Sequence, residues 1–336
     1  MKKHAIIPVF ISHRGCPNNC VFCNQKKITA RQGDVTIQDV EDTINTYMST
    51  LKDMNLECIE LSFYGGSFTG LPMDEQNAFL NIADDYKERG IISKIHMSTR
   101  PDYIDERILD NLKAKSVDVI ELGVQSFDDE VLRKSKRGHT SDDVYRACSL
   151  IKDYGFTLGI QLMAGLPGDS RKSCIYSAEE TAAIKPELAR IYPTLVIDDT
   201  ELYDMYIRGE YTPLSLEEAV SVSKDMYVIL DDAGINIMRV GLKATDVINK
   251  SGAVTGDTFH PAFRQLVEGL IARERIEAQL DSSDTSVTVL CRPQDVSSAS
   301  GHRGCNRAYF AEKYPGLKMS FKSDDSIEKN TYRVLR

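Results

Sequence analysis

The chain has 336 residues, a hydrophobic fraction of 42% that is ordinary for a globular protein, and a formal net charge of −9. This acidic balance argues against a general polyanion binder, so any contact with nucleic acid requires a local basic patch. No apolar run reaches membrane-spanning length, and the interrupted run MKKHAIIPVFIS at the start predicts a first strand rather than a signal peptide, so we expect a cytoplasmic protein.

Strand-like runs alternate with helical stretches as far as about residue 200. The strand-like runs cover residues 4–11, 58–66, 94–100, 118–126, 157–165 and 187–197. Repeated strand–helix units predict parallel strands joined by right-handed crossovers. We therefore expect an α/β fold, either an open sheet or a partial (β/α)6 barrel of the TIM type, with the site built by loops after the strands.

The rhythm changes after residue 200. Two long helices are expected at 216–234 and 260–280, and a polar break, DSSDTS, leads into a compact tail. We predict three parts: a core in residues 1–200, a helical extension in 201–281 and a small C-terminal α+β unit of order βααβ in 282–336.

Three cysteines lie close together in RGCPNNCVFC, the loop after the first strand. Cys16, Cys20 and Cys23 form the pattern C-x3-C-x2-C, and a tight cluster in a reducing compartment indicates a metal rather than disulfides. A structural zinc site would need a fourth ligand, such as His13 or Cys58. Three thiolates can instead hold three corners of a four-iron cluster and leave one iron open. We favour the iron–sulfur cluster.

The cysteine pattern resembles the cluster motif of radical S-adenosylmethionine (SAM) enzymes. In that family the open iron binds the methionine part of SAM, and an electron from the cluster cleaves SAM to a 5′-deoxyadenosyl radical that abstracts a hydrogen atom. The resemblance implies a [4Fe–4S] cluster held by Cys16, Cys20 and Cys23, SAM as cofactor, and a reducing electron donor such as flavodoxin or ferredoxin. It also implies the radical SAM form of the partial barrel.

Motifs at the later strand ends extend this resemblance. Phe22 matches the aromatic residue that contacts adenine, and Gly65 and Gly66 in YGGSF resemble the motif that contacts the SAM amino group. Arg137 matches an arginine that pairs with the SAM carboxylate, although a solvated basic helix end is an equal alternative. The remaining positions assigned to the SAM site are Ser98, Arg100, Gln125, Gln161 and Met163.

Gln125 and Gln161 lie on buried strands and need polar partners, which a nucleoside or a neighbouring loop would supply. Ser98 stands where relatives often have a glutamate.

The segments STRPDYI, VIELGVQSFDDEVL, RGHT, GLPG and IYPTLVI together resemble the radical SAM subunit of Elongator, the complex that modifies wobble uridine in tRNA, over about residues 4–200. The Elongator enzyme has a wider first cysteine spacing and an acetyltransferase domain that binds acetyl-CoA. No stretch after residue 200 suits that domain, so its acetyl-CoA chemistry is not expected here. The motifs more weakly resemble the oxygen-independent coproporphyrinogen oxidases, whose extra cysteine is replaced by Asn24.

The tail contains GHRG, a GxxG turn between two expected helices that are flanked by strands. This order resembles the minimal KH module, which clamps single-stranded nucleic acid at the turn. Gly301 and Gly304 would admit a phosphate, and His302, Arg303 and Arg307 add positive charge. The alternative is a small capping unit with a glycine turn.

These features support three hypotheses. The first is a radical SAM enzyme that acts on RNA, with tRNA as the expected partner; the second is a radical SAM enzyme that acts on a small molecule; the third is a non-catalytic zinc or iron–sulfur RNA-binding protein. Catalytic residues beyond the SAM site are not assigned. Tyr64 and Tyr192 sit at positions that could face the barrel interior but are expected to be packing residues, and the role of His139 stays open.

Overall fold

The structure is a computed structural model that describes residues 4–11, 15–16, 19–24, 35–245, 248–249 and 252–336. His13, considered above as a zinc ligand, lies outside these residues. Within the described ranges, no helix is both long enough and apolar enough to cross a membrane.

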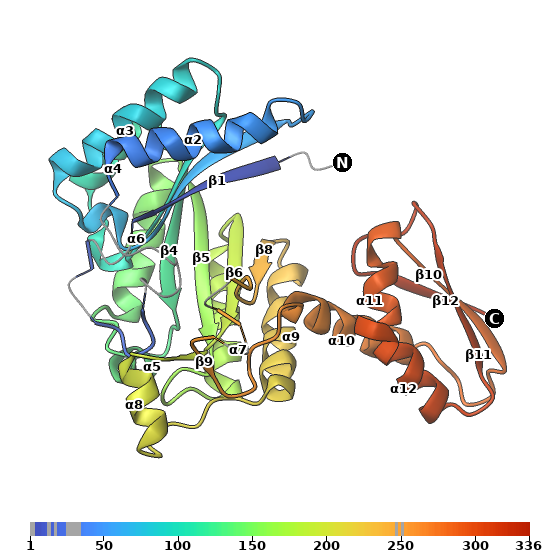
Figure 1. Cartoon of the computed structure of the whole chain (residues 1–336). Coiled ribbons are helices and arrows are strands. Elements are labelled where there is room, and N and C mark those ends of the chain that lie inside the picture. The colour runs from blue at the N-terminus through green and yellow to red at the C-terminus, as the bar shows by residue number, and fades with distance from the viewer. Residues whose placement is uncertain (1–3, 12–14, 17–18, 25–34, 246–247, 250–251) are drawn as a thin grey trace.

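Seven parallel strands form one curved sheet in the order β1-β2-β3-β4-β5-β6-β8, the half-barrel in Figure 1. The strands are β1 (His4–Ile11), β2 (Cys58–Gly65), β3 (Lys94–Thr99), β4 (Val119–Gln125), β5 (Thr157–Ala164), β6 (Leu188–Pro193) and β8 (Asn236–Val240). Every pair of neighbours is parallel. The predicted α/β partial barrel is confirmed, with one strand more than the six expected.

Helices follow the strands and cover the outer face of the sheet, as Figure 1 shows for α2, α3 and α4. Their bounds are α2 (Ile37–Leu51), α3 (Met73–Glu88), α4 (Glu106–Ala114), α5 (Asp129–Lys134), α6 (Ser141–Asp153), α7 (Arg171–Ile184), α8 (Glu201–Ile207) and α9 (Leu216–Asp232). Several begin at a side-chain cap; Thr36 and Asp39, for example, form a capping box at the start of α2.

The strands alternate between apolar and polar residues, which assigns their two faces. On β2, Leu61 and Phe63 belong to the main hydrophobic core together with helix residues such as Leu80. The intervening residues, Glu60 and Ser62, are polar and face the opposite side. Parallel strands covered by helices on both faces are usually apolar throughout, so this alternation indicates a sheet with a polar inner face.

Two parts of the sheet differ from the expectation. The run at 187–197 divides at Pro193 into β6 and a short β7 (Val196–Ile197), which pairs antiparallel with β9 (Val254–Thr255). β8 was not predicted as a strand because it is short and was assigned to the connection between two long helices. It lies within the segment expected to be a helical extension, and it completes the sheet beside β6.

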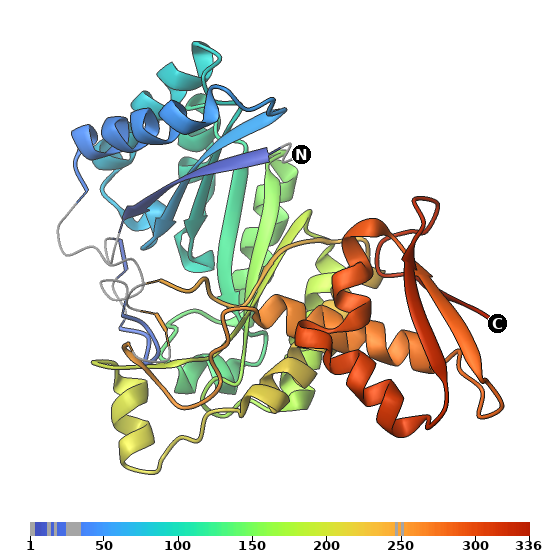
Figure 2. The ribbon, with the colours of Figure 1, turned by 45° about the vertical axis from the view of Figure 1, so that its right-hand side comes forward.

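The tail is a separate three-stranded sheet packed on helices, beside α9 and on the side of the barrel away from α2 and α3 (Figure 2). Its elements are α10 (Phe263–Glu277), β10 (Ser286–Cys291), α11 (Val296–Ser300), α12 (Cys305–Lys313), β11 (Lys318–Ser323) and β12 (Tyr332–Leu335). β10 pairs parallel with β11 and antiparallel with β12. The expected βααβ order is present, with β12 as an additional strand.

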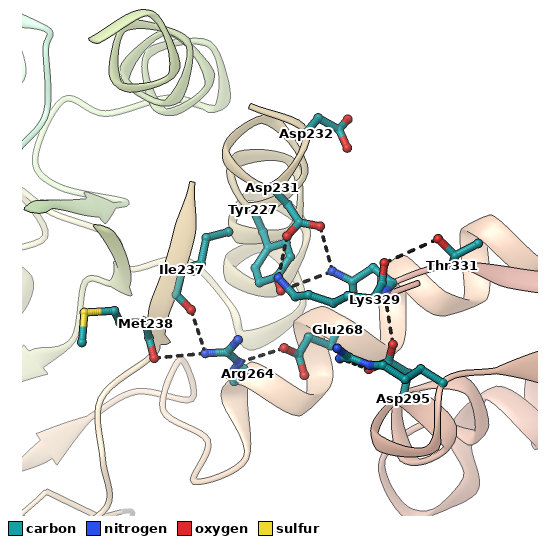
Figure 3. A network of polar contacts seen from close by, with 12 residues as sticks. Tyr227, Asp231, Asp232, Ile237, Met238, Arg264, Glu268, Asp295, Lys329 and Thr331 are labelled. Atoms are coloured by element: carbon teal, nitrogen blue, oxygen red, sulfur yellow. Dashed lines mark hydrogen bonds and ion pairs between the residues drawn. The ribbon is translucent and has the colours of Figure 1, made fainter. Parts of the chain in front are cut away.

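One asparagine ties the tail to the barrel. Asn330 is buried at φ +56°; its side chain donates to Asp231 at the end of α9 at 2.8 Å, and its backbone N–H donates to Asp295 at 3.0 Å. The carbonyl of Asn330 accepts from Arg275 at 2.7 Å, and Lys329 reaches the other Asp231 oxygen at 2.6 Å. Figure 3 shows Asp231, Asp295 and Lys329 converging from three parts of the chain.

A second tie lies beside it. Arg264, at the start of α10, donates to the carbonyls of Ile237 and Met238 on β8, both at 3.1 Å, and pairs with Glu268 at 2.8 Å (Figure 3). The long helix α10 is therefore fixed to the barrel at its start, and its later residues Ala272 and Ile276 contribute to the core of the tail.

We expect Asn330→Ala to destabilise the tail by about 2 kcal/mol or more, because alanine loses the bond to Asp231 and tolerates a positive φ poorly. Asn330→Gly keeps the backbone conformation and should lose less. Chemical unfolding and hydrogen exchange of β12 measure the effect. The exposed Glu328→Ala serves as the control, and equal stability of Asn330→Ala and this control would contradict the role of Asn330.

Candidate active site

Two glycines hold the cysteine loop against the loop after β2. Gly15, at φ +72°, lies so close to this loop that a Cβ atom there would be 2.0 Å from the carbonyl oxygen of Ser67. A Cβ on Gly70 would be 2.1 Å from the carbonyl oxygen of Gly15. The Gly66 N–H donates to the Ile11 carbonyl at 2.7 Å and extends the same contact. Gly15 and Gly70 were missed in the sequence, although Gly15 directly precedes the first cysteine.

The three cysteines follow this contact but are not gathered into a finished metal site. Cys20 is buried and Cys16 and Cys23 are half-buried. Among the described residues, no three cysteine, histidine or carboxylate side chains lie together at metal-binding distances. Cys58, the alternative zinc ligand, starts β2 and therefore lies at the opposite end of that strand from Gly65.

Arg137 is directed at a cysteine rather than at solvent. Its side chain is buried, and it donates to the Cys20 sulfur at 3.2 Å and to the Gly123 carbonyl at 2.5 Å. Burial raises the pKa of the Cys16 thiol and Cys20 adds to the rise, while Arg100 and Arg137 oppose it. The solvated helix end proposed as the alternative for Arg137 is therefore wrong, because its guanidinium is buried against the cysteine loop.

Arg100 and His139 bring further buried nitrogen atoms to the same region. Arg100 holds Asp102 through two bonds of 2.9 and 2.8 Å, and its remaining Nη1 is buried without a hydrogen-bond partner among the described residues. His139 contacts the Val124 carbonyl through Nε2 at 3.3 Å. Burial, with Arg137 as the next cause, lowers the pKa of His139 to about 3, so its ring is neutral at physiological pH. The open Arg100 nitrogen is a donor suited to an anionic ligand group.

The two glutamines expected at the SAM ribose lie side by side. Gln161 on β5 donates to the Gln125 side-chain oxygen on β4 at 3.2 Å. Gln125 adopts φ +72°, where the register between β4 and β5 shifts after Gly123. A non-glycine residue held in this conformation is typical of functional sites. Each glutamine side chain is thus a hydrogen-bond partner of the other.

An apolar wall lies next to this pair. Phe22 and Tyr192 pack against Met163 in one cluster that also contains the buried side chains of Val131 and Leu166. Gly65, at φ +106°, ends β2, and Ser98 is half-buried on the inner face of β3. The structure thus places Gly65 and Gln125 at the carboxyl ends of their strands and Ser98, Gln161 and Met163 within neighbouring strands. The contact of these residues with SAM stays a prediction.

A chain of buried charges crosses the inner face, and the sequence did not reveal it. His96 on β3 contacts Glu60 on β2 through Nδ1 at 2.7 Å and Glu121 on β4 through Nε2 at 3.5 Å. Arg190 on β6 pairs with the same Glu121 oxygen at 2.7 Å and donates to the Tyr64 hydroxyl at 2.7 Å. The only signal in the sequence was the polar alternation within these strands.

Their pKa values fit paired charges. Burial alone would raise the pKa of Glu121, but Arg190 and His96 hold it at about 2. Burial works against the charged form of His96, yet hydrogen bonds with Glu121 and Glu60 raise its pKa above the ordinary value. The imidazolium form of His96 therefore separates two carboxylates that would otherwise repel each other.

We expect His96→Gln to destabilise the protein by about 3 kcal/mol or more, because it leaves two buried carboxylates without their shared cation. Since the folded state raises the pKa of His96, this contribution is complete below the unfolded pKa of about 6.5 and is lost as the pH rises through the folded value. Unfolding free energies of both proteins between about pH 6 and pH 9 test this. His4→Gln, which removes a half-exposed histidine 3.3 Å from Glu60, is the matched control; a His96 variant no less stable than this control would contradict the pairing.

Comparison with protein families gives two matches. Residues 10–180 match the model of the radical SAM superfamily, and residues 186–273 match the radical SAM C-terminal domain. The second match includes β8, the strand missed in the sequence.

Individual relatives agree with these matches. A tRNA uridine(34) acetyltransferase from Methanocaldococcus jannaschii is 30% identical over 257 residues, which cover 65% of this chain and 47% of that protein. Elongator complex protein 3 from Dictyostelium discoideum is 31% identical over 262 residues, with 65% and 47% coverage. The chain spans about half the length of these curated relatives.

A solved structure shares the fold. The archaeal Elp3 of Methanocaldococcus infernus, with an N-terminal deletion, superimposes with a TM-score of 0.67 at 24% identity, covering 82% of this chain and 64% of that chain. The family matches extend over the half-barrel, the cysteine loop and the strand ends that carry Gly65, Gln125 and Gln161. This chain belongs to the radical SAM superfamily.

Proposed function

We propose that this chain is a radical SAM enzyme that modifies an RNA, with tRNA as its substrate class. The observation that carries the proposal is the match of 65% of this chain to proteins named as tRNA uridine acetyltransferase and Elongator complex protein 3. Because the chain spans only about half of those proteins, the group added and the position modified are not transferred from them.

The residues at the carboxyl end of the barrel fit the cofactors that the family uses. Arg137 donates to the Cys20 sulfur, and Arg100 keeps one buried donor for an anionic group. A [4Fe–4S] cluster bound there would supply reductive cleavage of SAM, the chemistry that this family shares. The residues that would hold the cluster are Cys16, Cys20 and Cys23.

The SAM contacts divide between polar and apolar residues. Arg100 would offer its open Nη1 to the SAM carboxylate, with the charge of Arg137 in the same region, while Gln125 and Gln161 would offer amides to the ribose. Phe22 and Met163 offer an apolar surface to adenine. Together these residues would orient the cofactor and exclude water from its reactive end.

The tail is the proposed RNA-binding part. Arg303 and Arg307 are exposed beside the GxxG turn, and α12 begins directly after Gly304. His302 instead points to α10, where Nδ1 contacts Gln265 at 2.9 Å, so it contributes less to the proposed surface than the sequence suggested. Gly301 is required by packing, since a Cβ there would lie 2.6 Å from the Asn306 nitrogen.

The main test is SAM cleavage. We expect the protein, reconstituted anaerobically with iron and sulfide and reduced with dithionite, to form 5′-deoxyadenosine from SAM, and bulk tRNA to increase the rate. A rate of 5′-deoxyadenosine formation that tRNA does not change would contradict the RNA substrate but support the radical chemistry. If protein that carries its full complement of iron and sulfide does not cleave SAM, the proposal that the chain is a radical SAM enzyme is wrong.

Arg303→Glu should weaken the binding of bulk tRNA several-fold and reduce its salt dependence by about one counterion, because it removes one phosphate contact. Filter binding at several salt concentrations measures both. Arg107→Glu, an equal charge change at an exposed site on α4, is the control. Equal binding by the two variants would exclude the GxxG turn as an RNA contact.

Gly15→Ala should lower iron and sulfide incorporation severalfold, because its Cβ would collide with the Ser67 carbonyl and displace the cysteine loop. Gly90→Ala is a close control, since Gly90 has nearly the same φ, +70°, but open space around it. Iron analysis and the visible absorbance of the cluster give the result. Equal loading of the two variants would show that the glycine contact does not position the cysteines.

A further inference from the structure

Arg190 connects two tyrosines on the inner face of the barrel. It lies on β6 with 8% of its surface exposed, and Nε pairs with Glu121 at 2.7 Å. Nη2 donates to the Tyr64 hydroxyl at 2.7 Å, and Nη1 is 3.4 Å from the Tyr192 hydroxyl. All three nitrogens of the guanidinium are thus engaged within this cluster, so its charge is already committed.

The hydroxyl hydrogens of the two tyrosines remain able to donate. In each contact the tyrosine oxygen accepts from Arg190, and a hydroxyl that accepts one bond still has its own hydrogen to donate. Burial raises the pKa of Tyr64 to about 12, so this hydroxyl keeps its hydrogen at physiological pH. Both tyrosines are half-buried, whereas Arg190 and Glu121 beneath them are buried.

The strand register brings this cluster next to the expected SAM residues. Tyr64 directly precedes Gly65 on β2. Arg190 is the register partner of Gln161, and Tyr192 is the partner of Met163. A group bound by the two hydroxyls would therefore lie beside the cofactor, where a radical reaction requires its substrate.

We propose that Tyr64 and Tyr192, held by Arg190, bind a neutral carbonyl-bearing part of the substrate, such as the edge of a nucleobase. The inference rests on the proposed function, because it names the residues that hold the RNA base. Two hydroxyl donors suit carbonyl oxygens, and a cation already paired with Glu121 does not favour a carboxylate or phosphate. An anionic substrate would instead need a second cation, for which Arg239 on β8, the register partner of Arg190, is the candidate. The propionate titration below tests that alternative.

The structural alternative is that the two hydroxyls only accept from the buried N–H groups of Arg190. Hydroxyls with that role alone would not respond to an added carbonyl compound, which the first experiment below measures. The buried charges act as a support that fixes Arg190, which in turn fixes both hydroxyls. Tyr64 also stacks edge-on against His96, with ring centroids 5.5 Å apart, so the same support holds its ring.

The first experiment measures binding without turnover. Protein with 13C-labelled tyrosine rings is titrated with millimolar uridine, cytidine or propionate, and Tyr64→Phe and Tyr192→Phe identify the two resonances. We expect uridine, which presents two carbonyl oxygens, to shift both resonances more than cytidine, which presents one. Shifts with propionate alone would overturn the proposal in favour of an anionic substrate.

The second experiment measures turnover. Each phenylalanine variant should lower the tRNA-stimulated rate of 5′-deoxyadenosine formation, at limiting tRNA, by roughly five- to tenfold, the effect of one lost hydrogen bond. Thermal unfolding separates this loss from a folding defect, and Tyr47→Phe on the exposed face of α2 is the control. Rates within about twofold of that control, a margin set by ordinary hydrogen-bond energies, with unshifted resonances in the first experiment, would refute the proposal.

The two proposals fail in different ways. If wild-type protein cleaves SAM at a rate that tRNA does not change, the proposed RNA substrate is wrong. The nucleoside titration then still decides whether the tyrosines bind a carbonyl group. If tRNA stimulates the wild type and both phenylalanine variants equally, the RNA function stands and the tyrosine assignment fails.

Discussion

The half-barrel depends on the pairing of charges that its inner face cannot avoid burying. Glu60, His96, Glu121 and Arg190 come from four strands, and each contacts a charge on a neighbouring or next-nearest strand. Removing Glu121 takes from Arg190 its charged partner, and removing His96 takes from Glu60 its buried one. Either change costs far more than a surface pair contributes. The chain of charges therefore fixes the relative positions of these strands while keeping the inner face polar.

The same principle operates at the carboxyl end of the barrel at shorter range. There, Arg137 reaches across from the loop after β4 to a cysteine of the loop after β1, and the backbone of Gly15 touches the loop after β2. Three loops distant in sequence are thus held by one cation and one close backbone contact.

Much of the barrel could be predicted from sequence because each strand carries its own local signal. Six strands of the sheet and the cysteine loop were identified from apolar runs, turns and motif order. β8 was missed because five residues after a long helix give too short a pattern. Gln125 and Gln161 were expected to need polar partners because they lie on buried strands, and the structure places their side chains in direct contact; their binding of SAM stays a prediction.

The remaining site residues act only through partners distant in the chain. His96 and Glu60 are 36 residues apart in the chain, and Arg190 and Glu121 are 69 residues apart. No local sequence pattern could therefore predict either pair. The collision that requires glycine at position 15 depends in the same way on Ser67 and Gly70. Such residues become visible only once the strand register is known.

The attachment of the tail bears on how an RNA would be presented to the barrel. Asn330 and Arg264 bind the tail and α10 to α9 and β8 through several hydrogen bonds that are at least partly buried. β8 lies beside β6, which carries Arg190 and Tyr192. A substrate held by the tail would therefore reach the inner face in a fixed orientation. The entropy lost in orienting the tail relative to the barrel would already have been lost on folding, and not on binding.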